Sequence, residues 1–194
     1  MTERIEGNSL IDCRKKFYHY FKENAEINGD IINVQSFLNH QILPEVLECI
    51  VIYFKESLSN IIFDKILTVE SSGISIASVL SYLTKKPFIF AKKKRPITMD
   101  SFYYSKSYSF TKQSETELFV AKSVLSKGDR IVFVDDFFAQ GSTLNSVEDI
   151  CKQAGAEVLA KCVVINKSNR DDIICLLNIN DLKSILNENN ESKS

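Results

Sequence analysis

Two adjacent carboxylates, Asp135 and Asp136, follow an apolar run of four residues and precede a short loop that contains Gly141, Ser142 and Thr143. A helical pattern follows the loop. Backbone N–H groups at such a loop bind phosphate, because they are unpaired and lie at the positive end of the helix dipole. Carboxylates at the carboxyl end of a strand can bind sugar hydroxyls or Mg²⁺. The order strand, acid pair, loop and helix therefore predicts a site for a phosphorylated sugar, and a buried strand that ends in an Asp-rich turn is the alternative.

Two further segments could bind anions at the same edge of a sheet. Residues 70–73, Glu-Ser-Ser-Gly, lie between an apolar strand and a helical pattern, so their backbone N–H groups can hold a second anion. Lys92 and Lys93 follow the next predicted strand and could neutralise a pyrophosphate. Taken singly, the two segments are better explained as a tight turn and a solvated charge run. Together with the acid pair they predict a phosphate site and a pyrophosphate site around a bound sugar.

Strands that alternate with helices would position these segments. This alternation predicts an α/β fold with a central, mostly parallel sheet flanked by helices. Residues 10–24 form an amphipathic pattern that predicts a helix packed on its own domain, with a membrane or RNA contact as the alternative. The polar, Tyr-rich residues 96–116 predict a two-stranded excursion or a mobile loop. Strands are expected at residues 31–34, 65–69, 87–91, 131–134, 158–165 and 173–177, and helices at 44–57, 74–83 and 145–153.

Composition narrows the class of protein. The 194 residues are enough for one domain with a real core, and the net charge of −1 argues against a general nucleic-acid binder. No apolar run approaches the roughly 18 residues that a membrane span requires. The five cysteines are odd in number and lack a Cys-x-x-Cys pair, so they are expected to be reduced thiols, without disulfides or zinc. The charged N-terminus does not resemble a signal peptide, and we expect a cytoplasmic protein.

Several segments resemble those of bacterial xanthine phosphoribosyltransferases, within the type I phosphoribosyltransferase family. The acid pair and its loop resemble that family's motif for phosphoribosyl pyrophosphate (PRPP). The resemblance implies the type I fold with a small hood and a mobile loop. It divides the chain into an N-terminal helical extension (1–30), a phosphoribosyltransferase domain with its hood (31–186) and a disordered tail (187–194). The segments that carry the resemblance beyond the motif are residues 36–42, 68–74, 90–93, 108–113 and 152–156.

The resemblance also implies roles for individual residues. Asp135 and Asp136 would act in catalysis by holding the ribose and a Mg²⁺ ion, directly or through ribose hydroxyls and water. Lys112, in the mobile loop, would be a third catalytic residue. The purine would be held by Asn39, Lys167 and the backbone near Ile32. The residues that would contact PRPP are Ala139, Gln140, Gly141, Ser142, Thr143, Glu70, Ser71, Ser72, Gly73, Lys92, Lys93, Tyr108 and Ser109.

The function that these roles imply is purine salvage, in which xanthine and PRPP give xanthosine 5′-monophosphate and pyrophosphate. Ala139 stands where hypoxanthine-guanine enzymes carry an Asp, a feature shared with the xanthine enzymes. Ser142 and Thr143 stand where xanthine enzymes usually have Gln-Ala, and adenine or orotate enzymes are more similar there. An adenine or other purine phosphoribosyltransferase therefore remains an alternative. A non-catalytic regulator that senses PRPP is another, although such regulators usually carry an added DNA-binding domain.

The resemblance implies small-molecule substrates and a homodimer, without nucleic-acid or membrane partners. Phe37, Leu38 and Ile42 form an apolar cluster in the sequence that could serve as a subunit interface. The alternative is that the N-terminal helix covers these residues in a monomer.

Overall fold

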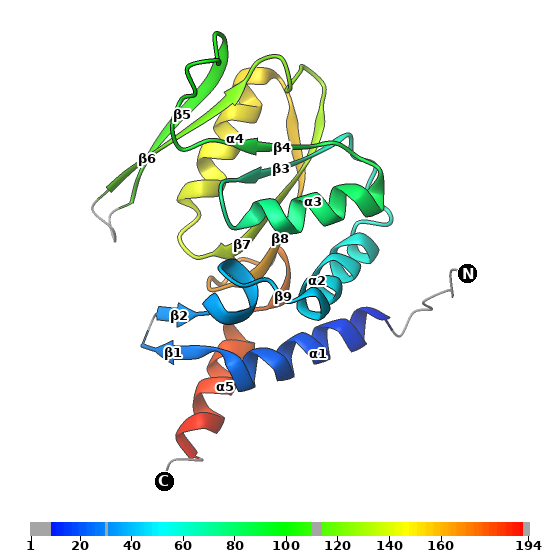
Figure 1. The fold of residues 1–194 in the computed structure, drawn as a ribbon, viewed down its shortest axis with the longest axis vertical. Coiled ribbons are helices and arrows are strands. Elements are labelled where there is room, and N and C mark those ends of the chain that lie inside the picture. The colour runs from blue at the N-terminus through cyan, green and yellow to red at the C-terminus, as the bar shows by residue number, and fades with distance from the viewer. Residues whose placement is uncertain (1–8, 30, 110–113, 192–194) are drawn as a thin grey trace. The chain divides into compact units, whose positions relative to one another are not determined.

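The structure, a computed structural model, describes residues 9–29, 31–109 and 114–191 (Figure 1). Its central sheet has five strands in the order β4-β3-β7-β8-β9. Contacts along the chain define two compact units. Unit 1 comprises Met1–Ser59, Asp136–Ala139 and Val163–Ser194, and unit 2 comprises Asn60–Asp135 and Gln140–Cys162.

Unit 2 contains the parallel strands that the sequence predicts. Strand β3 (Lys65–Val69) pairs in parallel with both β4 (Phe88–Ala91) and β7 (Arg130–Phe138). Helix α3 (Gly73–Thr84) follows β3, and helix α4 (Ser142–Ala154) follows β7. The last four residues of β3 are all buried, as expected of a strand covered on both faces. The predicted α/β fold with a parallel sheet is thus confirmed for these strands.

One strand end differs from the sequence-based expectation. Strand β7 does not stop before the acid pair but runs through Asp135 and Asp136 to Phe138. Phe138 is only 5% exposed, so its burial favours extended backbone beyond the carboxylates. The two acids therefore belong to the strand itself. Strand β8 (Glu157–Asn166) covers the predicted 158–165.

The Tyr-rich segment forms a two-stranded ribbon, which confirms one of the two expectations for it. Strand β5 (Phe102–Ser109) pairs antiparallel with β6 (Ser114–Ala121), and Figure 1 shows the ribbon beside α4. Gln153 of α4 donates its Nε2 hydrogen to the Tyr104 carbonyl at 2.7 Å, which fastens the ribbon to that helix. Residues 110–113, including the predicted catalytic Lys112, lie outside the described residues.

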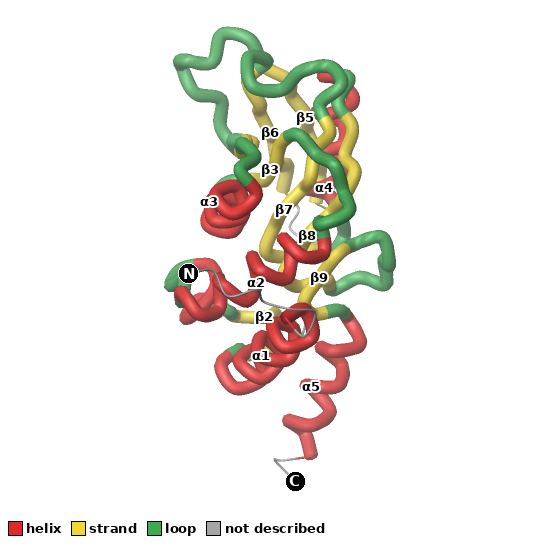
Figure 2. The backbone as a smooth tube through the Cα atoms, turned by 90° about the vertical axis from the view of Figure 1, so that its right-hand side faces the viewer, coloured by secondary structure: helices red, strands yellow, loops and turns green. Residues whose placement is uncertain are grey.

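The N-terminal helix α1 (Ser9–Asn24) packs within unit 1, as its amphipathic pattern predicts. Phe17 and Phe21 are 1% and 0% exposed. Arg14 donates from Nε to the Leu176 carbonyl at 3.0 Å and from Nη2 to Asp181 at 2.8 Å. These bonds connect α1 with the end of β9 (Ile174–Leu177) and the start of α5 (Ile179–Glu191), and Figure 2 shows the helices side by side.

The C-terminal residues correct an expectation. Residues 187–191, expected to belong to a disordered tail, form the end of α5. Helix α5 is held because Leu182 and Ile185 are buried and Glu188 forms an ion pair with Lys22 of α1. Residues 192–194 lie outside the described part of the chain.

A small hairpin and a π-helix follow α1 in unit 1. Strand β1 (Glu26–Asn28) pairs antiparallel with β2 (Ile31–Asn33) across a turn that contains Gly29 at φ +59°. The π-helix η1 (Gln35–Asn39) follows, and helix α2 (Pro44–Ser57) begins and ends as predicted. Strand β1 and the π-helix have no counterpart in the sequence-based expectation.

The apolar cluster proposed for a subunit interface is mostly inside unit 1. Phe37 and Leu38 are 0% and 2% exposed. The Phe37 ring packs edge-on against Tyr20 and Phe21 of α1, with centroids 5.3 and 6.4 Å apart. The interface expectation for Phe37 and Leu38 is therefore wrong, because both side chains are buried within unit 1 and α1 packs against Phe37.

All five cysteines are free thiols in the structure. Burial between α1 and α2 raises the pKa of Cys13 to about 11, and burial in α4 raises that of Cys151 to about 12. Among the described residues, no cluster of His, Cys, Asp or Glu could hold a metal ion by itself. No helix in the same part of the chain is long and apolar enough to cross a membrane.

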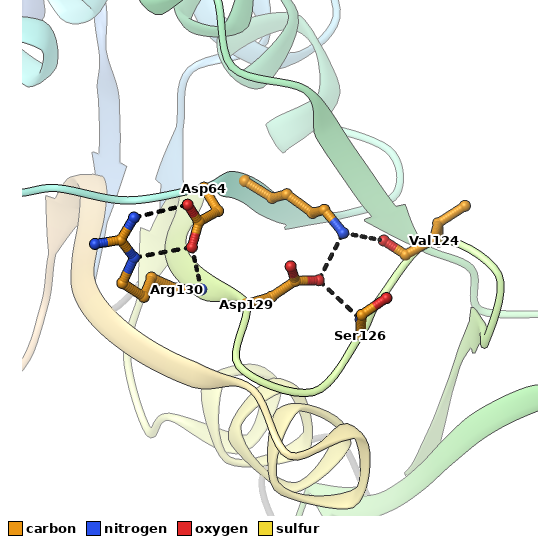
Figure 3. A network of polar contacts seen from close by, with 6 residues as sticks. Asp64, Val124, Ser126, Asp129 and Arg130 are labelled. Atoms are coloured by element: carbon orange, nitrogen blue, oxygen red, sulfur yellow. Dashed lines mark hydrogen bonds and ion pairs between the residues drawn. The ribbon is translucent and has the colours of Figure 1, made fainter.

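A polar network fastens the starts of β3 and β7 in unit 2 (Figure 3). Arg130 donates from Nε and Nη2 to both carboxylate oxygens of Asp64, at 2.9 and 2.8 Å, and its backbone N–H donates to the same group at 2.9 Å. Lys65 donates to Asp129 at 2.6 Å and to the Val124 carbonyl at 3.0 Å. The network lies at the end of the parallel strands opposite to the predicted loops, and it fixes the pairing of β3 with β7.

We predict that Arg130→Gln destabilises the protein at neutral pH and less so in acid. The Arg130 side chain, and then its backbone N–H, lower the pKa of Asp64. A lowered folded pKa contributes stability that is complete above the unfolded value of about 3.9 and is lost as the pH falls below it. Urea unfolding of both proteins at about pH 7 and about pH 3 checks this.

Lys106→Gln is the matched control, because its ion pair with Glu115 lies on the exposed β5–β6 ribbon and should contribute little. An Arg130→Gln deficit of the same size at both pH values would contradict the assignment to Asp64.

Candidate active site

In unit 2, the predicted anion loop of residues 70–73 and Asp135 lie close together on neighbouring parallel strands. The loop of residues 70–73 follows β3, and β7 carries Asp135 near its end. A Cβ atom on Gly73 would lie 3.3 Å from Asp135 Oδ1 and 2.0 Å from Thr68 Oγ1. The backbone of Gly73 therefore passes so close to Thr68 and Asp135 that no side chain fits there.

The cationic segment joins this arrangement through the same loop. Lys93 donates its backbone N–H to Glu70 Oε1 at 2.6 Å, and Glu70 donates its own N–H to the Ala91 carbonyl at 3.1 Å. Lys92 forms a two-way backbone bridge with Phe119 of β6, at 2.9 Å in each direction. Glu70 was predicted to contact PRPP, but here its carboxylate holds the lysine segment in place beside the loop.

The first turn of α3 presents backbone donors in the same place. Its N-cap residue Ser72 makes no side-chain cap hydrogen bond, and the Ile74 N–H donates to the Ser71 carbonyl at 3.1 Å. Uncapped N–H groups at a helix start are suited to an anion. Ser71 is exposed and Ser72 half-buried, so the loop is open to a ligand.

The loop before α4 has the geometry of the predicted phosphate loop. Gly141 precedes the helix at φ +81°, a conformation that favours glycine, and α4 also lacks a side-chain cap. Gln140 is exposed, and Ser142 and Thr143 are half-buried in the first helical turn. Ala139, at the start of this loop, is exposed and belongs to unit 1. The backbone N–H groups of the first turn can therefore bind a phosphate.

The acid pair is almost fully buried. Asp135 and Asp136 are 9% and 8% exposed. Asp136 Oδ1 accepts a hydrogen bond from the N–H of Phe137 at 2.9 Å, which orients that carboxylate. Ionised carboxylates only accept hydrogen bonds, so this pair can bind hydroxyl groups or a hydrated cation.

Lys167, predicted to contact the purine, lies next to the end of β7 within unit 1. Its backbone N–H donates to the Phe138 carbonyl at 2.7 Å. The buried Asn166 shapes the turn that carries it: Asn166 Oδ1 accepts from the Ser168 N–H at 2.9 Å, and Asn166 Nδ2 donates to the Arg170 carbonyl at 2.9 Å. This loop is fixed by local hydrogen bonds rather than by core packing.

Asn39 is the last residue of η1 and has an unusual environment. Its Oδ1 atom is buried and accepts no hydrogen bond from the described residues. Asn33, by contrast, donates to Glu26 and accepts from the Gln35 N–H. A buried amide oxygen without a donor is costly, so a ligand that donates there would gain affinity. Ile32, the other predicted purine contact, lies opposite Ile27 in the β1–β2 ladder.

Two predicted PRPP contacts lie on the ribbon. Tyr108 and Ser109 are opposite Glu115 and Ser114 in the β5–β6 ladder, so their backbone is part of a paired strand. The sequence reasoning missed Thr68 and Asn166. Both are polar residues near the end of an apolar strand, and that position is the signal that could have identified them.

Comparison with known proteins assigns the family. Residues 35–177 match the phosphoribosyl transferase domain, so the chain belongs to that family. It is 40% identical over 146 residues to a xanthine phosphoribosyltransferase of Oenococcus oeni, which covers 75% of this chain and 71% of the relative. It is 39% identical over 152 residues to xanthine phosphoribosyltransferase 1 of Clostridium perfringens, covering 77% and 80%.

Solved structures agree on the fold. An adenine phosphoribosyltransferase from Rhodothermus marinus superposes with a TM-score of 0.69 at 17% identity, covering 84% of this chain and 99% of the other. An APRTase from Giardia lamblia gives a TM-score of 0.71 at 14% identity, covering 83% and 97%. At these identities the similarity defines the type I phosphoribosyltransferase architecture and not the base.

We predict that Gly73→Ala weakens PRPP binding at least tenfold. The added Cβ would overlap the buried Thr68 hydroxyl, so the loop and Asp135 must shift, and overpacking of this kind costs about 1–3 kcal/mol. Titration calorimetry with PRPP and Mg²⁺ measures the affinity.

The control is Gly128→Ala, where φ is +85° but nothing lies within 4 Å of the new Cβ. It should lose a little stability from backbone strain and keep its PRPP affinity. Normal affinity in Gly73→Ala would contradict the close packing described above.

Proposed function

We propose that this chain is a xanthine phosphoribosyltransferase, which converts xanthine and PRPP to xanthosine 5′-monophosphate and pyrophosphate. The observation that carries the proposal is the 39–40% identity to enzymes of that name over three quarters of the chain. The loop geometry of unit 2 agrees with it, because two uncapped helix starts and two lysines meet at one sheet edge.

The proposed reaction forms a bond between a purine nitrogen and the anomeric carbon, while the bond from that carbon to the pyrophosphate oxygen breaks. The electron pair leaves with pyrophosphate, and the purine loses a proton. The start of α4 would hold the 5′-phosphate, and the loop of residues 70–73 with Lys92 and Lys93 would neutralise the leaving pyrophosphate. Asp135 and Asp136 would accept hydrogen bonds from the ribose hydroxyls and so hold the sugar in the reactive geometry.

The donor set fits Mg²⁺ that arrives with the substrate. The acid pair supplies carboxylate oxygens, but the described residues contain no third ligand to complete a protein cage. Mg²⁺ prefers one or two carboxylates together with waters and substrate phosphates, so Asp135 and Asp136 would hold it, directly or through water. When bound, the ion would neutralise charge on pyrophosphate.

For the base, we propose that Asn39, Lys167 and the backbone near Ile32 recognise the purine. The buried Asn39 Oδ1 needs a donor, and xanthine offers ring N–H groups. A lysine would favour the oxo group and readily formed anion of xanthine over the exocyclic amine of adenine.

The experiment that tests the function is an assay of five purines with PRPP and Mg²⁺. We expect xanthine to be the best substrate. Asp135→Asn combined with Asp136→Asn should reduce turnover at least a hundredfold, about 3 kcal/mol of transition-state stabilisation, because each amide lacks the negative charge and one of the two acceptor oxygens of the carboxylate. If another purine were preferred, the assignment of xanthine as the substrate would be wrong. Near-normal turnover in the double variant would refute the site assigned to the acid pair.

We predict that Lys167→Ala raises the Michaelis constant for xanthine about tenfold and leaves PRPP binding unchanged, since it removes a charged contact to the base alone. Lys152→Ala, an exposed lysine on α4, is the control and should change neither. Calorimetry with each ligand separates the outcomes, and equal weakening of both would make Lys167 a structural residue.

We also propose a homodimer. Only the family resemblance supports it, because Phe37 and Leu38 are buried within the chain and cannot form the interface. Ile31 and Ile42 remain exposed, at 71% and 39%. Light scattering of the active protein at micromolar concentration should give about twice the 22.1 kDa chain mass. A fully active species of 22.1 kDa would exclude the dimer.

A further inference from the structure

Thr68 is a buried polar residue that the roles assigned above do not use. It lies near the end of β3 in the apolar strand Lys-Ile-Leu-Thr-Val and is 0% exposed. Its Oγ1 has no hydrogen-bond partner among the described residues. Burying a hydroxyl without a partner costs about 1–3 kcal/mol, and valine would fill the same volume without that cost. The hydroxyl therefore calls for an explanation in the site around it.

The surroundings of the hydroxyl connect it with the acid pair. Thr68 Oγ1 and Asp135 Oδ1 both lie within 3.3 Å of the point where a Cβ on Gly73 would be. All three residues belong to unit 2, so the geometry is that of one compact body. The hydroxyl rotates freely and can donate a hydrogen, whereas an ionised carboxylate only accepts. Thr68 is thus a buried donor beside the carboxylate assigned to the ribose.

We propose that Thr68 is a positioning residue that acts through Asp135: when PRPP is bound, its hydroxyl donates a hydrogen bond to the Asp135 carboxylate and holds it toward the ribose hydroxyls. The inference rests on the proposed function of this site. A hydrogen bond to a charged group contributes more than one between neutral groups, and in a buried site its loss is felt by whatever the carboxylate binds. Threonine supplies both the donor and the shape that packs against Gly73.

Thr68→Val is the first test, because it removes the hydroxyl and keeps the shape. We expect about tenfold weaker PRPP binding by calorimetry with Mg²⁺ and a similar fall in kcat, with the KM for xanthine unchanged. Thr68→Ser, which keeps the hydroxyl and loses a methyl group, should stay within about threefold of the wild type. Thr68→Ala compared with Thr68→Ser repeats the hydroxyl contrast if the valine variant does not fold.

The route through Asp135 is tested by a double-mutant cycle. In the Asp135→Ala background, Thr68→Val should change PRPP affinity by less than about twofold, since residue 135 then has no side-chain acceptor for the Thr68 hydroxyl. An effect of equal size in both backgrounds would overturn the proposal, as would valine and serine variants that are equally impaired, which would indicate packing alone. Wild-type protein that does not bind PRPP would refute the proposed function together with this inference. Wild-type protein that binds PRPP while Thr68→Val binds equally well would refute this inference alone.

Discussion

The parallel pairing of β3 with β4 and β7 is the constraint on which the chemistry of this protein depends. Because all three strands point the same way, the segments that follow them emerge at one edge of the sheet. The Asp64–Arg130 and Lys65–Asp129 contacts fix that pairing at the opposite end of the strands. A slip of the register would move the loop of residues 70–73 away from the acid pair, so a network remote from any ligand sets the geometry of the site.

At this edge the backbone, more than the side chains, defines the site. Gly73 leaves no room for a Cβ between Thr68 and Asp135, and Gly141 takes a positive φ before α4. Gly73 thereby brings the start of α3 close to Asp135, and Gly141 forms the N-cap of α4. Side chains then place the positive charge. Glu70 holds the lysine segment beside the loop by accepting a hydrogen bond from the Lys93 N–H. Its carboxylate is itself unsuited to contact phosphate.

Unit 1 contributes in a different way. Its helices α1, α2 and α5 and strand β9 form an apolar body, in which Phe17, Phe21 and Phe37 are buried. The polar residues assigned to the purine lie in irregular segments of this unit: Asn39 ends a π-helix, and Lys167 lies in a turn shaped by Asn166. Binding residues are commonly found in irregular segments held by a rigid scaffold, which agrees with the role in base selection proposed for these two residues.

The sequence by itself determined most of the strand and helix order, because apolar periodicity and turn residues act locally. It also singled out the candidate site: the acid pair, the loops of residues 70–73 and 139–143, and the lysine segment. It did not reveal that β7 runs on to Phe138 or that α5 continues to Glu191, since those ends depend on burial and on partners such as Lys22 far away in the chain. It also predicted that Phe37 and Leu38 lie on the surface, whereas both are buried in the structure. The Thr68 hydroxyl is buried without a hydrogen-bond partner because β3, the loop of residues 70–73 and β7 pack together around it. Spatial approach of this kind has no local signature, and tertiary structure alone decides it.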